Sequence, residues 1–387
     1  MSVPHQNSVF LFNPQNDLAL ANGSPTFTPP KSALDLAVSG ACLPMWYGER
    51  GDYFIGAVNA LWYDSICNAF GIETTPTMRV PDNVYPSPWG WSPATLRYLK
   101  EFGFDEKVLP SVEQVADWRT MSSRATSVPL ISDIIEKSVN FISGDKPLFK
   151  PRIAHSVEEA LCYIDEIGVA MLKLPWSNSG RGQQVSDRTT PEELLRRITG
   201  MLNRQGAIEI TPLYNKTLDF AMLWDKGVFI GYSLFTTDSH GGWIQNILMS
   251  DDEIEKLINE TVGRHINFKE NINIFTAILK EFSSKFNYTS PIGVDFLISQ
   301  NDDGCNIVPI EINWRRTMGH VSHKLANQYI FPGNKNFFRI LPSSTLKAPF
   351  HHVTDCIIEN QRLISGELDI TPPGGAFRFL LTCEAKS

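Results

Sequence analysis

One stretch, Pro291 to His323, concentrates acidic, amide and arginine side chains in a segment whose pattern predicts a single β-hairpin. Two apolar strands, Ile292 to Ile298 and Asn306 to Asn313, flank a polar turn that contains Asp302 to Gly304. The stretch therefore predicts one hairpin that gathers acidic, amide and arginine side chains.

The alternation of side chains along a strand sets which polar groups meet. Glu311 and Asn313 share one face of the second strand. If the turn is a three-residue loop with its glycine in the left-handed position, Asn301 pairs with Cys305 and Asp295 lies directly opposite Glu311. Two carboxylates and an amide are then expected around one point.

Two carboxylates at this separation repel each other unless a cation or a proton lies between them. The oxygen ligands of Asp295, Glu311 and Asn313 suit Mg2+ or Mn2+, which binds substrate phosphates alongside one or two carboxylates. Arg315 and Arg316 follow at once and offer the planar guanidinium that matches phosphate oxygens. The hairpin thus predicts a metal and phosphate site.

The alternative is a solvated face of an edge hairpin. We adopt that interpretation for Asp302 and Asp303, as turn formers, and the functional one for the three residues within apolar strands, since buried charges are usually paired or metal-bound. Pro309 cannot donate to the strand ladder, so it predicts an edge strand or a bulge.

Composition limits the classes of function. The chain has 387 residues and a net charge of −8, which argues against a broad nucleic-acid surface. No apolar run reaches the length of a membrane span and no signal peptide pattern opens the chain, so a cytoplasmic protein of two or three domains is expected. The six cysteines lack zinc-site spacing and are expected to be reduced, mostly buried thiols.

The N-terminal segment predicts a strand, Ser8 to Phe12, that enters a polar turn, Asn13 to Asp17. A strand followed by such a turn suggests a sheet edge that faces a ligand. A helix cap is the other interpretation of Asn16 and Asp17. This first domain is expected to end near residue 120.

Capping patterns mark several helices. Ser92 precedes one with Pro93 at its first position, Ser156 opens another, and Thr190 opens a third that ends at Gly206. A further helix is expected from about Thr126, with Pro129 in its first turn and Arg124 just before it.

A strand from Val169 to Leu174 carries Lys173 and leads into a polar glycine-bearing loop, Pro175 to Gly182. Such a loop can fold over phosphates and donate backbone N–H groups to them. It matches neither the P-loop spacing nor the dinucleotide-binding fingerprint. An ordinary hairpin is the alternative.

Together these features resemble the ATP-grasp superfamily over roughly residues 120 to 325. The resemblance implies an α+β fold: an α/β N-terminal domain (1–120), an ATP-grasp domain (121–330) whose two α+β subdomains, about 121–220 and 221–330, clamp ATP, and a C-terminal extension (331–387) packed on it.

The resemblance also implies roles for individual residues. Lys173 would contact the nucleotide phosphates, Arg124 would take the place of the family's second phosphate lysine, and Arg315 or Arg316 would reach the γ-phosphate or the acyl phosphate. Asp295, Glu311 and Asn313 would hold Mg2+. The remaining expected nucleotide contacts are the closing loop (Ser177, Asn178, Ser179, Gly180, Arg181 and Gly182), the adenine edge (Glu209 and Leu213) and the ribose contact (Asp219).

The leading hypothesis is an enzyme that uses ATP and Mg2+ (or Mn2+) to phosphorylate a carboxylate, after which an amine or thiol attacks the acyl phosphate and ADP and phosphate are released. Its partners would be small-molecule carboxylate and amine substrates, without nucleic acid or membrane, and a homodimer is left open. The alternatives are a non-catalytic ATP-binding or sensor module, and a glycan- or peptide-binding protein with an incidental acidic hairpin.

Overall fold

The computed structural model describes residues 6–142, 148–177, 182–187, 189–238, 241–301, 304–346 and 348–384. The chain forms two compact units: unit 1 comprises residues 1–116, 244–251 and 315–387, and unit 2 comprises residues 117–243 and 252–314. The C-terminal residues thus belong to the same unit as the N-terminal ones. Helices are combined with parallel and antiparallel sheets, so the predicted α+β class is confirmed.

Unit 1 begins with an α/β arrangement and ends with an antiparallel one. Its strands are β1 (Ser8–Leu11), β2 (Tyr53–Ile55), β3 (Thr75–Thr77), β4 (Tyr85–Pro88), β11 (Trp243–Ile247), β14 (Lys335–Pro342), β15 (Ile357–Glu359), β16 (Arg362–Asp369) and β17 (Phe377–Glu384). Its helices are α1 (Asn16–Asn22), α2 (Lys31–Ser39), α3 (Ala60–Phe70), α4 (Pro93–Phe102), α5 (Val112–Met121) and α12 (Met318–Gln328), with 3-10 turns η1 (Leu43–Trp46), η2 (Glu106–Val108), η3 (Ser343–Thr345) and η4 (Val353–Asp355). Helix α5 runs on into unit 2.

Two sheets organise unit 1. The first is parallel, in the order β3-β2-β1-β4, and in the second β14, β17, β16 and β15 pair antiparallel, with β11 on β14. Aromatic side chains from both ends of the chain share its core: Trp46 packs edge-on against Phe70 and Tyr329, and its Nε1 donates to the Ile370 carbonyl at 2.8 Å. The C-terminal strands therefore complete the N-terminal core.

Unit 2 contains two smaller α+β parts. Its strands are β5 (Arg152–Ala154), β6 (Ala170–Lys173), β7 (Gln183–Val185), β8 (Ile208–Pro212), β9 (Lys216–Asp225), β10 (Val228–Thr237), β12 (Ile292–Asn301) and β13 (Gly304–Asn313). Its helices are α6 (Arg124–Lys137), α7 (Val139–Ile142), α8 (Val157–Ile167), α9 (Pro191–Gln205), α10 (Asp251–Val262) and α11 (Phe268–Ser284).

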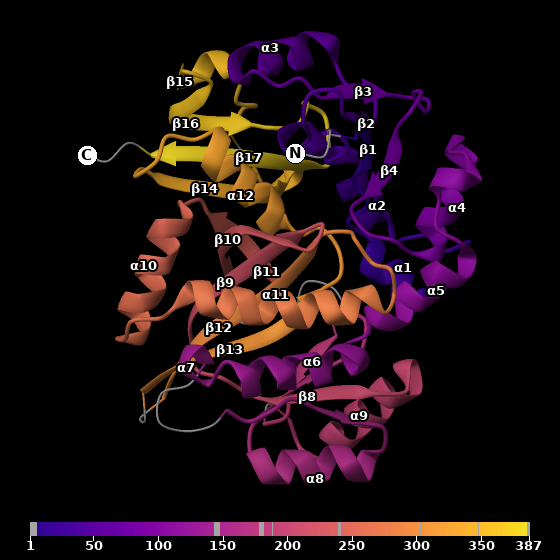
Figure 1. The fold of residues 1–387 in the computed structure, drawn as a ribbon, viewed down its shortest axis with the longest axis vertical. Helices are drawn as coiled ribbons and strands as arrows, with labels where there is room; N and C mark the ends of the chain where they lie inside the picture. Colours follow the sequence, from indigo (N-terminus) through magenta and orange to yellow (C-terminus); the bar gives the residue numbers. More distant parts are fainter. Residues whose placement is uncertain are drawn as a thin grey trace. The chain divides into compact units, whose positions relative to one another are not determined.

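The first part of unit 2 is an antiparallel sheet in the order β5-β8-β6-β7. Helices α8 and α9 lie together below this sheet in Figure 1 and bury apolar side chains such as Ala160 and Ile198 against Leu172 and Ile210. The Ser156 and Thr190 hydroxyls cap the two helices, as their sequences predict. This packing fixes β6, the strand that carries Lys173.

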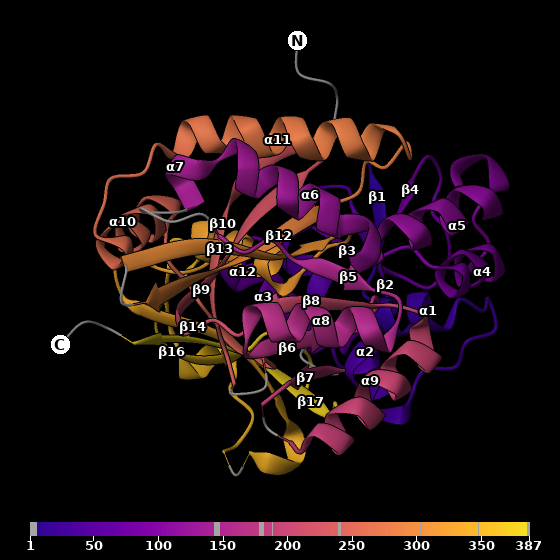
Figure 2. The same ribbon diagram turned by 90° about the horizontal axis from the view of Figure 1, so that it is seen from below.

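The second part is an antiparallel sheet in the order β13-β12-β9-β10. Helices α6, α7 and α11 run over one side of it (Figure 2), where the Phe141, Phe275 and Phe296 rings meet at centroid distances of 5.3–5.8 Å. Full burial of one such ring contributes about 1.5–3 kcal/mol, so this aromatic cluster holds β12 firmly.

Helix α6 begins earlier than expected. Ser123 is its N-cap and Arg124 its first residue, whereas the sequence predicted a start near Thr126 with Arg124 outside the helix. Pro129 consequently lies inside the helix and not in its first turn. The serine hydroxyl accepts from the Ala125 N–H, which outweighed the proline in setting the start.

The hairpin has a different register near its turn from the predicted one. Asn301 pairs with Gly304 rather than with Cys305, and a register shift between Asp295 and Phe296 then brings Asp295 opposite Glu311 as expected. The shift leaves one extra residue beside Pro309, and β13 is the edge strand of its sheet. Both predictions from the proline, an edge and a bulge, are thus confirmed, while Asp302 and Asp303 lie outside the described residues.

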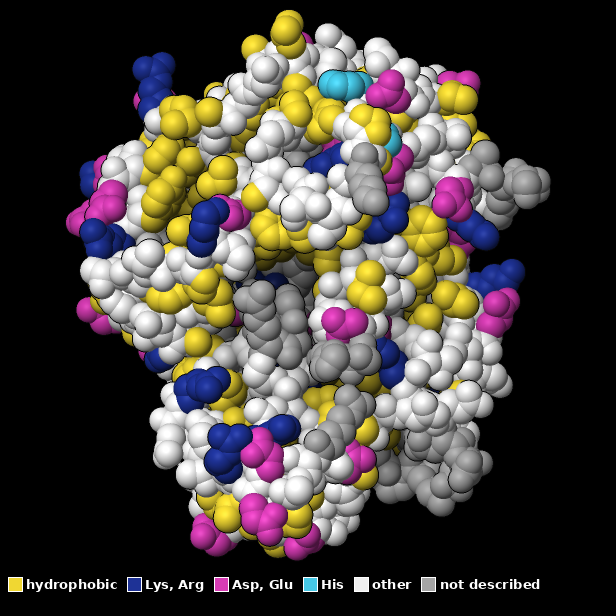
Figure 3. Space-filling view, turned by 180° about the vertical axis from the view of Figure 1, so that it is seen from behind, with side chains coloured by type: hydrophobic (Ala, Val, Ile, Leu, Met, Phe, Trp, Pro, Cys, Tyr) yellow, Lys and Arg dark blue, Asp and Glu magenta, His cyan; other side chains and the backbone are white. Residues whose placement is uncertain are grey.

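The surface carries mixed charge. Acidic and basic side chains are interspersed on the face in Figure 3, and the described residues form no broad basic area there. Within the described ranges, each helix is too short or too polar to cross a membrane. The described cysteines are all free thiols, but only Cys42 and Cys383 are buried, so the prediction that most of them are buried is wrong.

Candidate functional site

A carboxylate pair lies near the open end of the hairpin in unit 2, away from its turn. Asp295 on β12 and Glu311 on β13 are direct cross-strand partners, and the Asn313 amide Nδ2 donates to Asp295 Oδ2 at 2.9 Å. The Glu311 side chain is 24% exposed. The predicted grouping of two carboxylates and one amide is therefore present in the fold.

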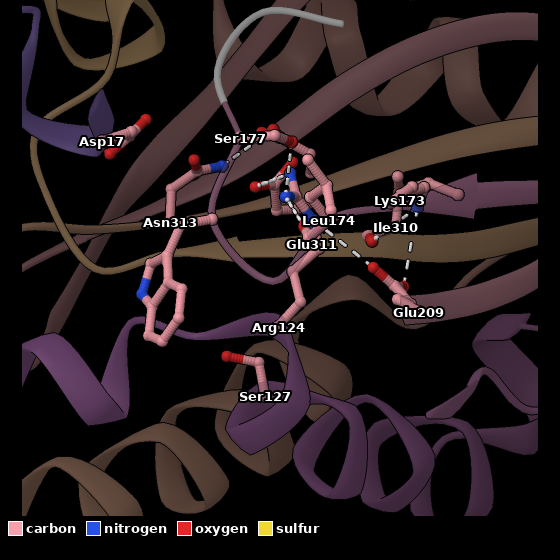
Figure 4. Close-up of polar contacts among 12 residues, drawn as sticks. Asp17, Arg124, Ser127, Lys173, Leu174, Ser177, Glu209, Ile310, Glu311 and Asn313 are labelled. Carbon is pink, nitrogen blue, oxygen red and sulfur yellow. Dashed lines mark hydrogen bonds and ion pairs between the residues drawn. The ribbon is translucent and has the colours of Figure 1, made fainter. Parts of the chain in front are cut away.

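Arg124 reaches this pair from the start of helix α6. Its backbone N–H donates to the Pro175 carbonyl at 3.0 Å. This hydrogen bond holds the start of α6 against the loop that follows β6. Its guanidinium donates to the Leu174 carbonyl at 2.8 Å, to Ser177 Oγ at 2.7 Å and to Glu311 Oε1 (Figure 4). A buried cation thus links the Ser177 end of the glycine loop to the carboxylate pair.

Lys173 and Glu209 form a second, deeper ion pair. They are cross-strand partners on β6 and β8 and are 3% and 1% exposed, with Nζ 3.6 Å from Oε1. Lys173 Nζ also donates to the Ile310 carbonyl at 3.5 Å, next to Glu311, and Glu209 Oε2 lies 3.4 Å from the Nε of Arg124 (Figure 4). Two buried cations therefore converge on the same part of β13.

Glu209 is held by charge rather than by hydrogen bonds. Neither of its carboxylate oxygens has a hydrogen-bond partner within the described residues. Burial, and after it the Glu209 charge, raises the pKa of Tyr214, whose hydroxyl donates to the Phe149 carbonyl at 3.4 Å. Both cations lie at ion-pair distances from Glu209, Arg124 at 3.4 Å and Lys173 at 3.6 Å.

The donor set at the carboxylate pair fits Mg2+ chemically, because all of its candidate ligands are oxygen atoms. Directly opposed like charges in a sheet are destabilising, and here Arg124 and the Asn313 amide compensate Glu311 and Asp295. A divalent cation could take over that compensation. The residues present therefore fit a magnesium site.

Other predicted nucleotide contacts lie elsewhere in unit 2. Asp219 on β9 is paired with Lys216 at 2.7 Å and accepts from the Thr237 hydroxyl at 3.0 Å. Leu213 follows β8, is 38% exposed and donates its N–H to the Val169 carbonyl at 2.9 Å. Their roles toward ribose and adenine, and that of Glu209 toward adenine, stay predictions.

The glycine loop is described only at its ends. Ser177 accepts from Arg124, and Gly182, with a φ of +81°, precedes β7. A side chain at Gly182 would combine backbone strain with a Cβ only 3.1 Å from Leu174. The loop residues Asn178, Ser179, Gly180 and Arg181 lie outside the described residues.

The two arginines that follow the hairpin belong to unit 1. Arg315 forms a bidentate pair with Asp17 of α1, at 2.7–3.0 Å. Arg316 is buried with its guanidinium carbon 4.5 Å from the Tyr47 ring centroid. Both side chains thus have contacts that the sequence did not predict.

Sequence reasoning also missed Arg264. Its guanidinium donates to the Cys305 carbonyl at 2.8 Å and to the Phe141 carbonyl at 2.9 Å, and it therefore ties the start of β13 to helix α7. Burial lowers the pKa of Arg264. No local pattern marks this residue, because its partners are backbone carbonyls far away in sequence.

Comparison with solved structures finds proteins of similar arrangement. They include N5-carboxyaminoimidazole synthetase from Staphylococcus aureus complexed with ADP (12% identity, TM-score 0.44, covering 88% of this chain and 83% of that chain). A biotin carboxylase from Campylobacter jejuni in complex with β-γ-ATP has 12% identity and a TM-score of 0.49, covering 98% and 88%. A phosphoribosylamine–glycine ligase from Thermotoga maritima has 11% identity and a TM-score of 0.49, covering 98% and 92%.

No protein-family model and no curated protein matches the chain. At the identities and scores above, the structural likeness says nothing about substrate or mechanism. Function has to be argued from the residues of the site.

Proposed function

We propose that unit 2 binds ATP with Mg2+, and that the protein is an ATP-grasp ligase that joins a carboxylate to an amine or thiol through an acyl phosphate, releasing ADP and phosphate. One observation carries the proposal. Two buried cations, Lys173 and Arg124, converge on a strand-borne carboxylate pair that fits a divalent metal. Phosphoryl transfer needs this combination, because the protein's task is to position and neutralise phosphate charge.

In this proposal Asp295, Glu311 and Asn313 would hold Mg2+, which supplies charge neutralisation for the phosphates. Arg124 would exchange its Glu311 partner for a phosphate oxygen. A guanidinium binds either oxyanion in the same planar manner, so the exchange costs little. Lys173 would turn from Glu209 toward the same phosphates, and the Ser177 to Gly182 segment would exclude water above them.

The first experiment measures ADP release with Mg2+-ATP and a panel of amino acids, dipeptides and small acids, followed by mass spectrometry of the mixture that responds. A ligase releases ADP rapidly when both the acid and its acceptor are present. With the acid alone it releases ADP slowly or not at all. ATP binding without ADP release from any mixture would contradict catalysis.

The sharper test is Glu311→Gln, which removes a ligand charge without changing the side-chain volume. We expect metal-dependent ADP release to fall about a hundredfold or more, since a metal contributes several kcal/mol of charge stabilisation. The control is Glu281→Gln on α11, whose exposed carboxylate pairs with Lys285 at 3.4 Å. ADP release at the wild-type rate in Glu311→Gln at saturating Mg2+ would rule out the assigned site.

One observation favours the non-catalytic alternative. Arg315, expected at the reacting phosphate, is engaged by Asp17 within unit 1. A sensor would bind ATP through Lys173 and Arg124 yet have no arginine for the transferred group. Calorimetry of ATP binding, run beside the ADP assay, separates the two functions because the sensor gives binding without turnover.

A further inference from the structure

The segment that follows β6 in unit 2 satisfies its backbone polar groups without a neighbouring strand. Strand β6 ends at Lys173 and β7 begins at Gln183, and residues 174–177 between them belong to no strand. Backbone N–H and C=O groups that are partly buried need hydrogen-bond partners, because an unpaired polar group away from water costs free energy. Here the partners are side chains of two helices, Arg124 of α6 and Gln205 of α9.

Arg124 holds one side of this segment (Figure 4). Its backbone N–H donates to the Pro175 carbonyl at 3.0 Å, and its Nη1 donates to the Leu174 carbonyl at 2.8 Å and to Ser177 Oγ at 2.7 Å. Its Nη2 points the other way and donates to Glu311 Oε1. The guanidinium therefore has one edge that the segment fixes and another edge that contacts an acidic side chain.

Gln205, the last residue of α9, holds the remaining residue of the segment. The Trp176 N–H donates to Gln205 Oε1 at 2.9 Å, and Gln205 Nε2 donates to the Trp176 carbonyl at 3.0 Å. One carboxamide thus serves both backbone groups of Trp176, as a paired residue in an antiparallel strand would. The indole is held as well, because its Nε1 donates to the Arg119 carbonyl at 3.2 Å and the Arg119 guanidinium lies 4.5 Å from the ring centroid.

The two side chains are linked through one peptide group. The peptide between Pro175 and Trp176 accepts from the Arg124 N–H with its C=O and donates to Gln205 with its N–H. A peptide group is planar, so its C=O cannot keep its direction when its N–H turns. Loss of the Gln205 carboxamide would therefore release the carbonyl that holds the start of α6.

We propose that Gln205 is a positioning residue for Arg124. It holds the Pro175–Trp176 peptide group in place, and the segment in turn fixes one edge of the guanidinium and directs the other toward Glu311. The inference rests on the proposed function for its consequence, since the directed edge would there bind a phosphate oxygen. Gln205 then contributes to nucleotide affinity without contacting the nucleotide.

Calorimetry of Mg2+-ATP binding measures that contribution. Gln205→Met keeps an unbranched side chain of similar length but removes both hydrogen bonds, and it should weaken ATP binding about tenfold, the change expected when one or two hydrogen bonds are lost. The matched control is Asn203→Met, which removes an exposed carboxamide from the same turn of α9 and should leave the affinity unchanged. Equal affinities in Gln205→Met and the wild type would overturn the proposal.

A second background separates positioning from general support of the fold. Arg124→Lys keeps the positive charge, but an ammonium group lacks the planar edge that the segment fixes. Gln205→Met should therefore change the ATP affinity of Arg124→Lys by less than about twofold, since the two residues act through one path. A loss of about tenfold in this background as well would show that Gln205 supports the fold independently of Arg124, and the proposal would be wrong.

Hydrogen exchange without nucleotide keeps the test independent of the ligase proposal. In Gln205→Met, exchange should accelerate both at Trp176 and at the start of α6, where the Arg124 N–H donates to the Pro175 carbonyl. Acceleration at Trp176 alone, or at neither place, would contradict a positioning role. A wild-type protein that binds no ATP would contradict the proposed function, while the exchange result would still decide the role of Gln205.

The wild-type protein alone covers the case in which the variant fails to fold. Its Trp176 amide lies outside the strands and should nevertheless exchange slowly, because Gln205 accepts its hydrogen bond. Rapid exchange of this amide, measured at single-residue resolution, would overturn the proposal.

Discussion

Glu209 is the most deeply buried acidic residue of the candidate site. It is 1% exposed, and its partners are Lys173 at 3.6 Å and Arg124 at 3.4 Å. A buried ion pair adds little net stability, yet removal of one partner leaves the other charge uncompensated in a low-dielectric interior. The pair therefore sets the position of Lys173 more than it stabilises the fold.

A double-mutant cycle tests this interpretation. Glu209→Leu alone should lower the free energy of unfolding by about 3–5 kcal/mol, because it leaves the buried Lys173 without a carboxylate. Lys173→Met alone should cost less, because Glu209 keeps Arg124 at 3.4 Å. The double variant should lose less than the sum, with a coupling of about 1 kcal/mol or more in urea unfolding. The exposed Arg97–Glu101 pair is the control, with an expected coupling of about 0.3–0.5 kcal/mol. Additive losses at Lys173 and Glu209 would mean that the two charges do not interact.

Residue-level prediction from the sequence succeeds where the partner is near along the chain and fails where it is remote. The serine and threonine caps depend on the next three residues, and they form as expected. The Arg315 pairing with Asp17 joins residues 298 positions apart, and no local pattern announces it. The role expected for Arg315 therefore rested on the motif alone.

At the scale of elements, the hairpin shows how a partly wrong register can still give the right site. The predicted pairing of Asp295 with Glu311 was counted from a three-residue turn without placing the bulge that Pro309 indicates, while the structure has Asn301 opposite Gly304 and one extra residue beside Pro309. The two differences cancel at Asp295 and Glu311. A proline indicates a bulge, but it does not indicate whether the register changes before or after it. The pairing near the turn could therefore not be derived from the sequence.

Helix α9 offers a matched pair of glycines for an element-scale prediction. Gly200 lies inside the helix with open space around its would-be Cβ, so Gly200→Ala should stabilise the protein by about 0.5–1 kcal/mol. Gly206 ends the helix with a φ of +76°, where Gly206→Ala should cost about 1 kcal/mol although space is equally open.

Both variants are measured by urea unfolding with unchanged m-values as the check on two-state behaviour. Equal effects from the two substitutions would contradict the left-handed end of α9. A loss in Gly200→Ala would contradict the open surroundings of that position.

At the scale of the whole molecule, the titrating groups with raised pKa are concentrated in unit 1. Burial raises the pKa of the Cys356 thiol to about 11 and that of Tyr329 to about 12, and it raises those of Cys67 and Cys383 as well. A raised folded-state pKa means that the folded protein holds its proton more tightly than the unfolded chain does. The stabilisation that these protonated groups provide is fully present below their unfolded-state pKa. It is lost as the pH rises through their folded-state pKa.

We therefore expect the stability of unit 1 to decline from about pH 9, the ordinary thiol value, to about pH 11 for Cys356. Peptide-resolved hydrogen exchange across this range should show unit 1 opening before unit 2. Cys356→Ala should flatten the decline, with Cys162→Ala, an exposed thiol, as the control. An identical decline in both variants and in the wild type would mean that the Cys356 thiol does not cause the loss of stability.

The division into units was the hardest feature to predict from the sequence. Predicted boundaries at 120 and 330 follow local pattern, and the first lies close to the change at residue 116. Residues 244–251 join residues 315–387 through the pairing of β11 with β14, and the C-terminal residues join the N-terminal segment through side-chain contacts such as Tyr329 on Trp46. The sequence pattern predicts which segments form strands, but side-chain packing determines which strands pair with each other.

The discontinuous makeup of unit 1 has a consequence for the protein during its synthesis. A ribosome makes β1 to β4 first, then all of unit 2, and only afterwards β14, β16 and β17. Until then Trp46 has neither the Ile370 carbonyl nor the Tyr329 ring, and Phe12 lacks Phe379. The nascent chain thus carries an unfinished apolar surface for most of its elongation, while unit 2 has all its strands once residue 314 has emerged. Unit 2 can fold while still tethered, and the first residues made are among the last to settle.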